Sequence, residues 1–230
     1  MLFHGGGLTA GTPLQDLDWA EPLAERGFVV LMAGYRLFDP ATGENPWPTQ
    51  IGDAWRAMRW IRAHAHEVNA DPRRIGAMGH SSGGHLAGLL GTTDPPSETD
   101  PDLARVSSRA DCVVTLAGDA DLSVPYEDPS TTRAFEAIFK GTMVERPEVW
   151  REASPVHHVD KATAPFLVIH GNRDQAVPIR MARNLAAALA AAGVEYVLAE
   201  LPVGHMEVGS HGSAIALWEA FLDRQLQPER

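Results

Sequence analysis

Cysteine is nearly absent from this sequence: Cys112 is the single one among 230 residues. A lone cysteine excludes an internal disulfide and a cysteine-based zinc site. Basic residues are also scarce, with 19 Lys and Arg against 30 Asp and Glu, which gives a formal net charge of −11. That balance argues against nucleic acids and anionic membrane surfaces as partners.

Long hydrophobic runs are missing as well. No stretch of about 18 apolar residues could span a membrane, and no signal peptide is recognisable. We therefore expect a cytoplasmic protein, unless the chain is truncated and a leader precedes it. Internal repeats and low-complexity tracts are absent too. With 44% hydrophobic residues, the chain can bury the core of a single domain over residues 1–230.

Short apolar runs predict the strands. Continuous runs, rather than alternating ones, are typical of a parallel sheet that is covered on both faces. The runs lie at residues 28–33, 74–78, 112–117 and 165–170, with a more mixed one at 196–201.

Segments with helical periodicity separate these strands. Residues 51–68 carry apolar side chains at spacings of three and four residues, with charges opposite. Residues 179–192 form an Ala- and Leu-rich segment that stops before Gly193, and residues 213–226 predict a last amphipathic helix. Alternating strands and helices indicate an α/β domain with right-handed crossovers.

The segment from Asp119 to Lys161 does not alternate cleanly. It is rich in proline and charge, and its one modest helical patch covers residues 132–139. Long insertions in compact domains are typically lids or binding loops. We interpret residues 119–161 as a small lid-like insertion beside the functional site.

A candidate nucleophile follows the run at 74–78. The chain continues there as Gly79-His80-Ser81-Ser82-Gly83 and then becomes an apolar helix. A tight turn from strand to helix needs glycine on both flanks and exposes the serine between them. Ser81 has glycine two residues before and two after it, whereas Ser82 has His80 at the first of these positions. The pattern therefore favours Ser81.

A serine hydroxyl needs a base, and the base needs an orienting acid. In a fold of this kind the acid and then the histidine follow later strands. Asp174 lies just past the run at 165–170, and His205 lies just past 196–201. Asp119 and Asp121, which follow the run at 112–117, remain alternatives for the acid. The other histidines are expected to pack, to support the site, or to begin the last helix; they include His80, His85, His170 and His211.

The chain opens with Met-Leu-Phe-His4-Gly5-Gly6-Gly7. Acyl transfer needs hydrogen-bond donors that point at the developing oxyanion. One such donor is the backbone N–H after the nucleophile, that of Ser82. Further donors are expected from a glycine-rich loop after an earlier strand, described for lipases and esterases as His-Gly-Gly-Gly. We therefore interpret residues 4–7 as the oxyanion loop.

Together these motifs resemble α/β-hydrolases of the esterase and lipase superfamily that carry an HGGG loop, of hormone-sensitive-lipase-like and acetylxylan- or feruloyl-esterase-like type. The resemblance spans almost the whole chain, through "HGGG", "YR" at 35–36, "GHSSGG", "SPVHHV", "HGNRDQAVP" and "GHME". It implies an α/β-hydrolase fold, a triad of Ser81, Asp174 and His205, an oxyanion hole of Gly6, Gly7 and Ser82, and neither metal nor cofactor.

The sequence departs from that family at three points. Leu8 stands where an aromatic residue often follows the glycines, and Ser82 stands where alanine is common. The family also carries strands before this loop that are absent here. The resemblance then places a strand at residues 1–4 between those at 28–34 and 74–79. We expect the apolar strand at 28–34 to be an edge, which favours a homodimer or aggregation.

The expected function is hydrolysis of small carboxylic esters through a covalent acyl-enzyme. Amide cleavage of the arylformamidase or peptidase type is an alternative, and a non-catalytic hydrolase scaffold is another. Trp47, Tyr126 and His157 are candidate substrate-binding residues, although packing within the core or loops is the more common role for residues of these types. The acyl chain and the alcohol are not specified by the sequence.

Overall fold

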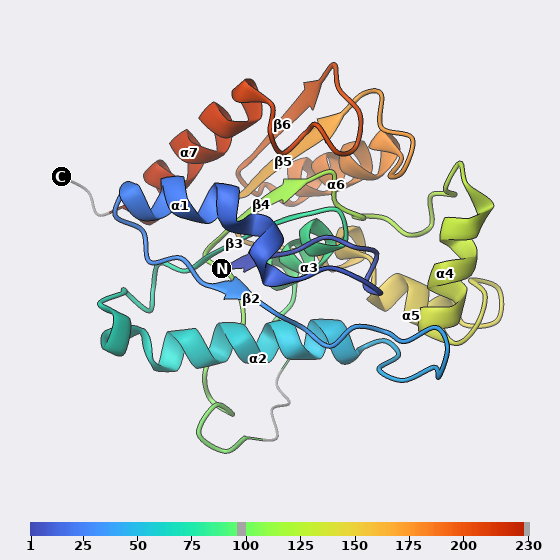
Figure 1. The fold of residues 1–230 in the computed structure, drawn as a ribbon, viewed down its shortest axis with the longest axis horizontal. Helices are drawn as coiled ribbons and strands as arrows, with labels where there is room; N and C mark the ends of the chain where they lie inside the picture. Colours follow the sequence, from blue (N-terminus) through green and yellow to red (C-terminus); the bar gives the residue numbers. More distant parts are fainter. Residues whose placement is uncertain (96–99, 228–230) are drawn as a thin grey trace.

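The computed structural model describes residues 1–95 and 100–227. Its centre is a six-stranded sheet in the order β2-β1-β3-β4-β5-β6, with every neighbouring pair parallel (Figure 1). The strands are β1 (Leu2–Phe3), β2 (Met32–Ala33), β3 (Gly76–His80), β4 (Cys112–Leu116), β5 (Phe166–Gly171) and β6 (Tyr196–Leu201). The predicted parallel α/β sheet, with its first strand between the second and third, is confirmed.

Helices cover both faces of this sheet. The helices are α1 (Leu17–Glu25), α2 (Thr49–Ala63), α3 (Ser82–Thr92), α4 (Pro129–Phe139), α5 (Pro147–Glu152), α6 (Ile179–Ala192) and α7 (Gly212–Leu226). In β4, Val113 packs into the core shared with α2, α3 and α6, whereas Val114 packs into the core shared with α1 and α7. Both side chains are buried, which explains why the central strands are continuous apolar runs.

Two of the three predicted amphipathic helices are found nearly unchanged, as α6 and α7. The third is interrupted: α2 ends at Ala63, and a short 3₁₀ helix (Ala65–Val68) follows. The backbone leaves the helical region at His64, where φ is −107° and ψ is 15°. No helix in the described ranges is long and apolar enough to cross a membrane.

Helix α1 and the 3₁₀ helix before it (Pro13–Asp16) were not expected from the periodicity of the sequence. A local signal is nonetheless present, because Thr12 and Gln15 have the spacing of a capping box with proline at the first helical position. The Gln15 side chain accepts a hydrogen bond of 2.9 Å from the Thr12 N–H. These two elements turn out to border the functional site.

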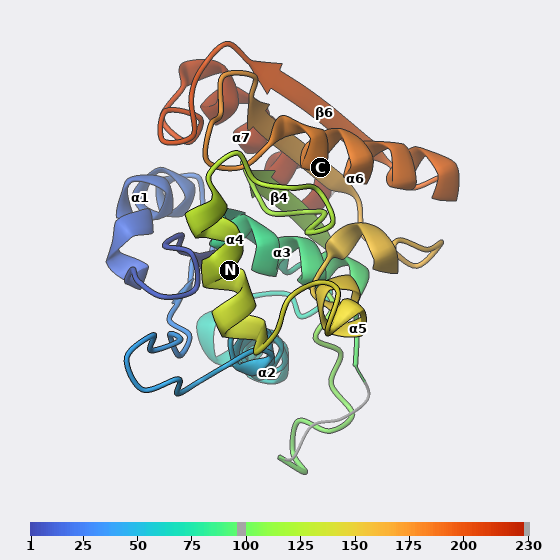
Figure 2. The same ribbon diagram turned by 90° about the vertical axis from the view of Figure 1, so that its right-hand side faces the viewer.

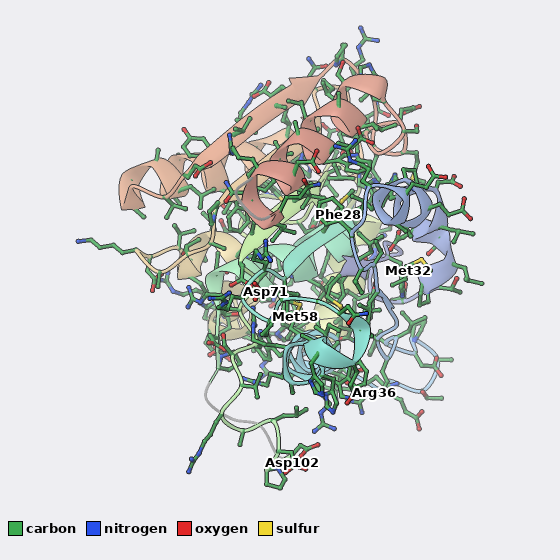
Figure 3. All side chains as sticks on the ribbon, turned by 90° about the vertical axis from the view of Figure 1, so that its left-hand side faces the viewer. Phe28, Met32, Arg36, Met58, Asp71 and Asp102 are labelled. Carbon is green, nitrogen blue, oxygen red and sulfur yellow. The ribbon has the colours of Figure 1, made fainter. Side chains whose placement is uncertain are left out.

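The edge strand is shorter than predicted. The expectation of a strand over residues 28–34 is wrong for residues 28–31 and for Gly34, since β2 comprises only Met32 and Ala33. The Phe28 N–H bonds instead to Leu23 O at the end of α1, and Leu31 O is the first acceptor that reaches Leu2 N of β1. Figure 3 shows Phe28 and Met32 along the segment that leads from α1 into this edge.

The insertion at residues 119–161 is more helical than its composition predicts. It contains α4, α5 and a 3₁₀ helix (Pro155–His158). Figures 1 and 2 place α4 and α5 at one end of the molecule, beside the loop that precedes α2. The Trp47 N–H bonds to Ile138 O, which ties that loop to α4. A lid function for this insertion stays a prediction.

Candidate active site

Ser81 occupies the turn between β3 and α3. Its φ of 56° and ψ of −126° lie in a region that non-glycine residues rarely adopt. The turn is tight because a Cβ at Gly83 would collide with the Phe3 carbonyl, and one at Gly79 would collide with the Gly83 backbone. Such backbone strain costs on the order of 1–3 kcal/mol and is concentrated at functional sites. The flanking glycines thus meet the steric requirement that the sequence suggested.

His205 lies in the loop after β6 and pairs with Asp174, which lies in the loop after β5. The distance from His205 Nδ1 to Asp174 Oδ2 is 2.7 Å. Because an ionised carboxylate can only accept, Nδ1 carries the proton and Nε2 is left as an acceptor. That is the tautomer a general base needs. Within the described residues no hydrogen bond joins Ser81 to His205, and such bonds often tighten only when substrate is present.

Four donors surround the Asp174 carboxylate. Its Oδ1 accepts from the N–H groups of Ala176 and Val177 at 2.9 Å each, and its Oδ2 lies 3.2 Å from His170 Nε2 as well as 2.7 Å from His205. Burial by itself would raise the pKa of Asp174, but the hydrogen bonds from His170, His205 and Val177 outweigh burial and lower it well below the ordinary value. Asp174 is therefore held ionised next to His205.

The contact of His170 with Asp174 was missed by the sequence reasoning, which assigned His170 only a buried structural role. His170 is fully buried, and its Nε2 also donates to Val177 O at 2.9 Å. Its position four residues before the acid is the signal that could have suggested the contact.

His80 also contacts His205. Its Nε2 donates to the backbone oxygen of His205 at 2.9 Å, and the two rings lie 4.6 Å apart. Burial, and next the proximity of His205, lower the pKa of His80 to about 4. A neutral His80 adds no positive charge beside a His205 that must itself accept a proton.

The glycine loop after β1 has the unusual backbone that the sequence implied. Gly6 has a φ of 123° and Gly7 a φ of 63°. His4 is buried and stacks on Tyr35 with ring centroids 4.3 Å apart, and the Tyr35 hydroxyl donates to His4 O at 2.8 Å. These contacts fix the start of the loop.

The N–H groups of Gly6, Gly7 and Ser82 have no hydrogen-bond partner within residues 1–95 and 100–227. The Ser82 N–H belongs to the first turn of α3, where helical N–H groups have no partner within the helix. Free donors around a serine are what an oxyanion hole requires. Gly6, Gly7, Ser81 and His205 line one pocket of about 550 Å³.

The alternative acids are engaged elsewhere. Asp119 accepts from the Tyr126 hydroxyl at 2.7 Å, and Asp121 accepts from Ser123 and Asn184. Neither is bonded to His205, whereas Asp174 is. The geometry therefore favours Asp174.

The three candidate substrate-binding residues do not line the pocket that contains Ser81. Tyr126 is buried and bonded to Asp119, and Trp47 stacks on His85 with centroids 5.4 Å apart. His157 lies in the 3₁₀ helix of the insertion. The pocket wall comes instead from the segment around α1 and from the loop after His205, through Gln15, Asp16, Asp18, Trp19, Met206, Gly209 and Ser210.

The described residues include no clear candidates for metal binding or for a thiol nucleophile. Within the described ranges, no group of three or more His, Cys, Asp or Glu side chains is placed to hold a metal ion. Burial raises the pKa of the Cys112 thiol to about 12, so this side chain stays protonated and is a poor nucleophile.

Known proteins share this architecture. The BD-FAE family profile matches residues 1–189. Esterase LipC of Mycobacterium tuberculosis is 33% identical over 203 residues, which cover 85% of this chain and 47% of LipC. The chain thus spans about half the length of the curated relatives it matches.

Solved structures agree with the family match. A truncated form of a carbohydrate esterase from gut microbiota superimposes with a TM-score of 0.85 at 28% identity, over 99% of this chain and 85% of that one. Esterase 2 of Thermogutta terrifontis, phosphonylated by sarin, has a TM-score of 0.83 at 28% identity, over 99% of this chain and 84% of that one. The chain belongs to the BD-FAE family and has the α/β-hydrolase fold of the HGGG-type serine esterases.

Proposed function

We propose that this protein is a serine carboxylesterase that hydrolyses small carboxylic esters through an acyl-enzyme. The observation that carries the proposal is the convergence, in one pocket, of the strained Ser81 with His205 and free backbone donors. The 2.7 Å bond from His205 to Asp174 adds the orienting acid. Its relatives among esterases support the same assignment.

In the acylation step, Ser81 Oγ attacks the ester carbonyl carbon while His205 Nε2 takes the hydroxyl proton. The carbonyl oxygen becomes negative and receives hydrogen bonds from the N–H groups of Gly6, Gly7 and Ser82. The carbon–oxygen ester bond then breaks, and His205 delivers its proton to the departing alcohol. Asp174 stabilises the imidazolium between these transfers.

Deacylation repeats the sequence with water. His205 removes a proton from the water as it attacks the acyl-Ser81 carbonyl, and the same backbone donors hold the second oxyanion. Collapse releases the carboxylic acid and returns the proton to Ser81 Oγ. The step consumes one water and leaves the enzyme unchanged.

Labelling with a fluorophosphonate tests the proposal directly. We expect a single adduct on Ser81, which the Ser81→Ala variant loses and the Ser213→Ala variant keeps, since Ser213 is an exposed residue of α7. The folded protein should hydrolyse p-nitrophenyl acetate and butyrate faster than the matching anilides. An adduct on Ser82, or no adduct on folded protein, would contradict the proposal; faster cleavage of anilides would favour an amidase.

A further inference from the structure

The catalytic pocket extends beyond Ser81 and His205 into a recess with an acidic wall. The recess is bordered by the start of α1 and by the loop after β6, which contacts α1 through the bond from Trp19 Nε1 to Gly209 O. Asp16 and Asp18 are its acidic residues, and no lysine or arginine of the described chain lines it. An anionic substrate group would be repelled there, and a cationic one attracted.

Asp16 is the unusual member of this wall. It is only 3% exposed, and its Oδ2 has no hydrogen-bond partner within the described residues. Burial raises the pKa of Asp16 to about 6, so the carboxyl is ionised at neutral pH. An ionised carboxylate without a donor is costly inside a protein. A cationic ligand in the recess would reduce that cost.

The position of His205 in this pocket assigns the recess to the alcohol side of the reaction. His205 must give its proton to the departing alcohol, so the alcohol oxygen sits next to the His205 ring. Past His205 along the chain, Met206, Gly209 and Ser210 continue the pocket, and Asp16 and Trp19 line the same pocket. On this ground we infer that the alcohol portion of an ester bound at Ser81 extends toward Asp16.

Trp19 completes the recess. Its Nε1–H donates to Gly209 O at 3.2 Å, and a side chain at Gly209 would collide with the indole ring. The ring is thereby fixed between α1 and the loop that carries His205. Tryptophan beside a carboxylate is a combination suited to an organic cation.

We propose that Asp16 binds a protonated amine on the alcohol portion of the substrate, with Trp19 beside the amine and Asp18 adding attraction at the exposed rim. The inference rests on the proposed esterase function and names the substrate class of that same pocket: esters of amino alcohols. The positive charge of the amine would offset the unpaired negative charge of the Asp16 carboxylate.

Matched acetates test this inference. Dimethylaminoethyl acetate and isopentyl acetate have the same shape, but only the first carries a protonated nitrogen at neutral pH. We expect kcat/KM for the amine ester to exceed that for its carbon analogue by about tenfold. The ratio should fall toward one in Asp16→Asn and, in part, in Asp18→Asn. It should stay unchanged in Asp102→Asn, which removes the same charge from a residue that does not line this pocket and that lies beyond α2 in Figure 3.

A second measurement needs no variant. On the unmodified protein, dimethylaminoethanol should slow fluorophosphonate labelling at lower concentration than isopentanol does. This comparison keeps the inference testable if Asp16→Asn does not fold.

The possible outcomes distinguish failure of the cation site from failure of the esterase function. Equal kcat/KM for the two acetates, on protein that hydrolyses both, overturns the cation site and leaves the esterase intact. Faster hydrolysis of 3-hydroxybutyl acetate than of the amine ester overturns it in favour of a hydroxylated alcohol. Absence of hydrolysis together with absence of fluorophosphonate labelling overturns the esterase function and the cation site together.

Discussion

The carboxyl ends of the central strands and the β2 edge of the sheet are built in opposite ways. At the carboxyl ends of β3, β5 and β6, the site residues are enclosed by hydrogen bonds, and Asp174 alone accepts from four donors. At the edge, β2 pairs over two residues only, and the preceding Val29 is 45% exposed. Many hydrogen bonds therefore fix the first region, whereas few fix the second.

Because of this difference, we expect substitutions in the two regions to affect different properties of the protein. The end of the sheet that holds the proposed triad contains groups that are unfavourable by themselves: a strained Ser81, the buried unpaired carboxyl of Asp16 and the partly buried His80. Substitutions there should change rates strongly and should in some cases stabilise the fold. Substitutions at the edge should change association and leave the chemistry alone.

The largest effect is expected at Ser81. Ser81→Ala should lower kcat for short p-nitrophenyl esters by on the order of 10⁴-fold or more, because the nucleophile is gone. The melting temperature should not fall, since alanine removes no hydrogen bond of the fold. Steady-state kinetics and calorimetry measure the two quantities. Near-normal turnover in Ser81→Ala, with Ser82→Ala inactive, would reassign the nucleophile.

A similar loss is expected at Asp174. Asp174→Asn should lower kcat by roughly 10⁴-fold, because the amide stabilises the wrong tautomer of His205. Asp121→Asn is the matched control, since Asp121 follows β4 as Asp174 follows β5 but bonds to Ser123 and Asn184. If Asp121→Asn loses activity and Asp174→Asn keeps it, the acid has been placed on the wrong strand.

His80 should make the catalytic end sensitive to acid. Its pKa is lowered from 6.5 in the unfolded chain to about 4 in the fold, so the unfolded state binds more protons between these values. The free energy of unfolding therefore decreases as pH falls from 6.5 to 4, by roughly 1–3 kcal/mol for this group.

His80→Gln tests that contribution. Glutamine does not titrate and can still donate to His205 O, so the melting temperature of this variant should fall less between pH 7 and pH 5 than that of the unmodified protein. His66→Gln is a suitable control, because His66 is 79% exposed. Parallel pH profiles for His80→Gln and the unmodified protein would assign the acid sensitivity to other groups.

Asp16 should change the pH dependence of stability in the opposite direction to His80. Its pKa rises from 3.8 to about 6 on folding, so the folded state binds more protons in that window. Ionised Asp16 lowers the free energy of unfolding. This destabilisation is absent below pH 3.8, grows up to pH 6 and is complete above pH 6. Asp16→Asn should therefore raise the melting temperature by a few degrees at pH 7.5 and have little effect at pH 4. A lower melting temperature at pH 7.5 would make Asp16 a structural residue.

The sequence predicts the fold best where strands are central. The apolar runs that became β4 and β5 are buried on both faces, so composition alone specifies their structure. At the edge, residues 28–34 have the same composition but lack a second neighbour, and only Met32 and Ala33 pair. Strand pairing depends on partner strands that are remote in the chain, so the local pattern of apolar residues cannot predict which residues pair.

The same limit applies to the site. That Ser81, Asp174 and His205 lie near one another could be predicted, because strand ends in a parallel sheet converge at one edge; their catalytic roles stay a prediction. The acidic wall could not be predicted, because it depends on α1 folding back beside the loop after β6, through contacts such as Trp19 Nε1 to Gly209 O, which link residues 190 positions apart. Likewise, nothing local distinguishes Tyr126, which turns inward to Asp119, from a residue that lines the pocket.

The smallest effect on activity is expected at the edge. β2 has no partner strand on its outer side within the described residues, and exposed apolar edges promote pairing with another chain. We expect self-association at high concentration, and Val29→Lys should shift the protein toward monomer while kcat/KM changes less than about twofold. Val144→Lys is the control, since Val144 is 91% exposed but lies between α4 and α5. Light scattering after size exclusion measures the shift. An unmodified protein that is monodisperse and monomeric at high concentration would remove the edge as an association surface.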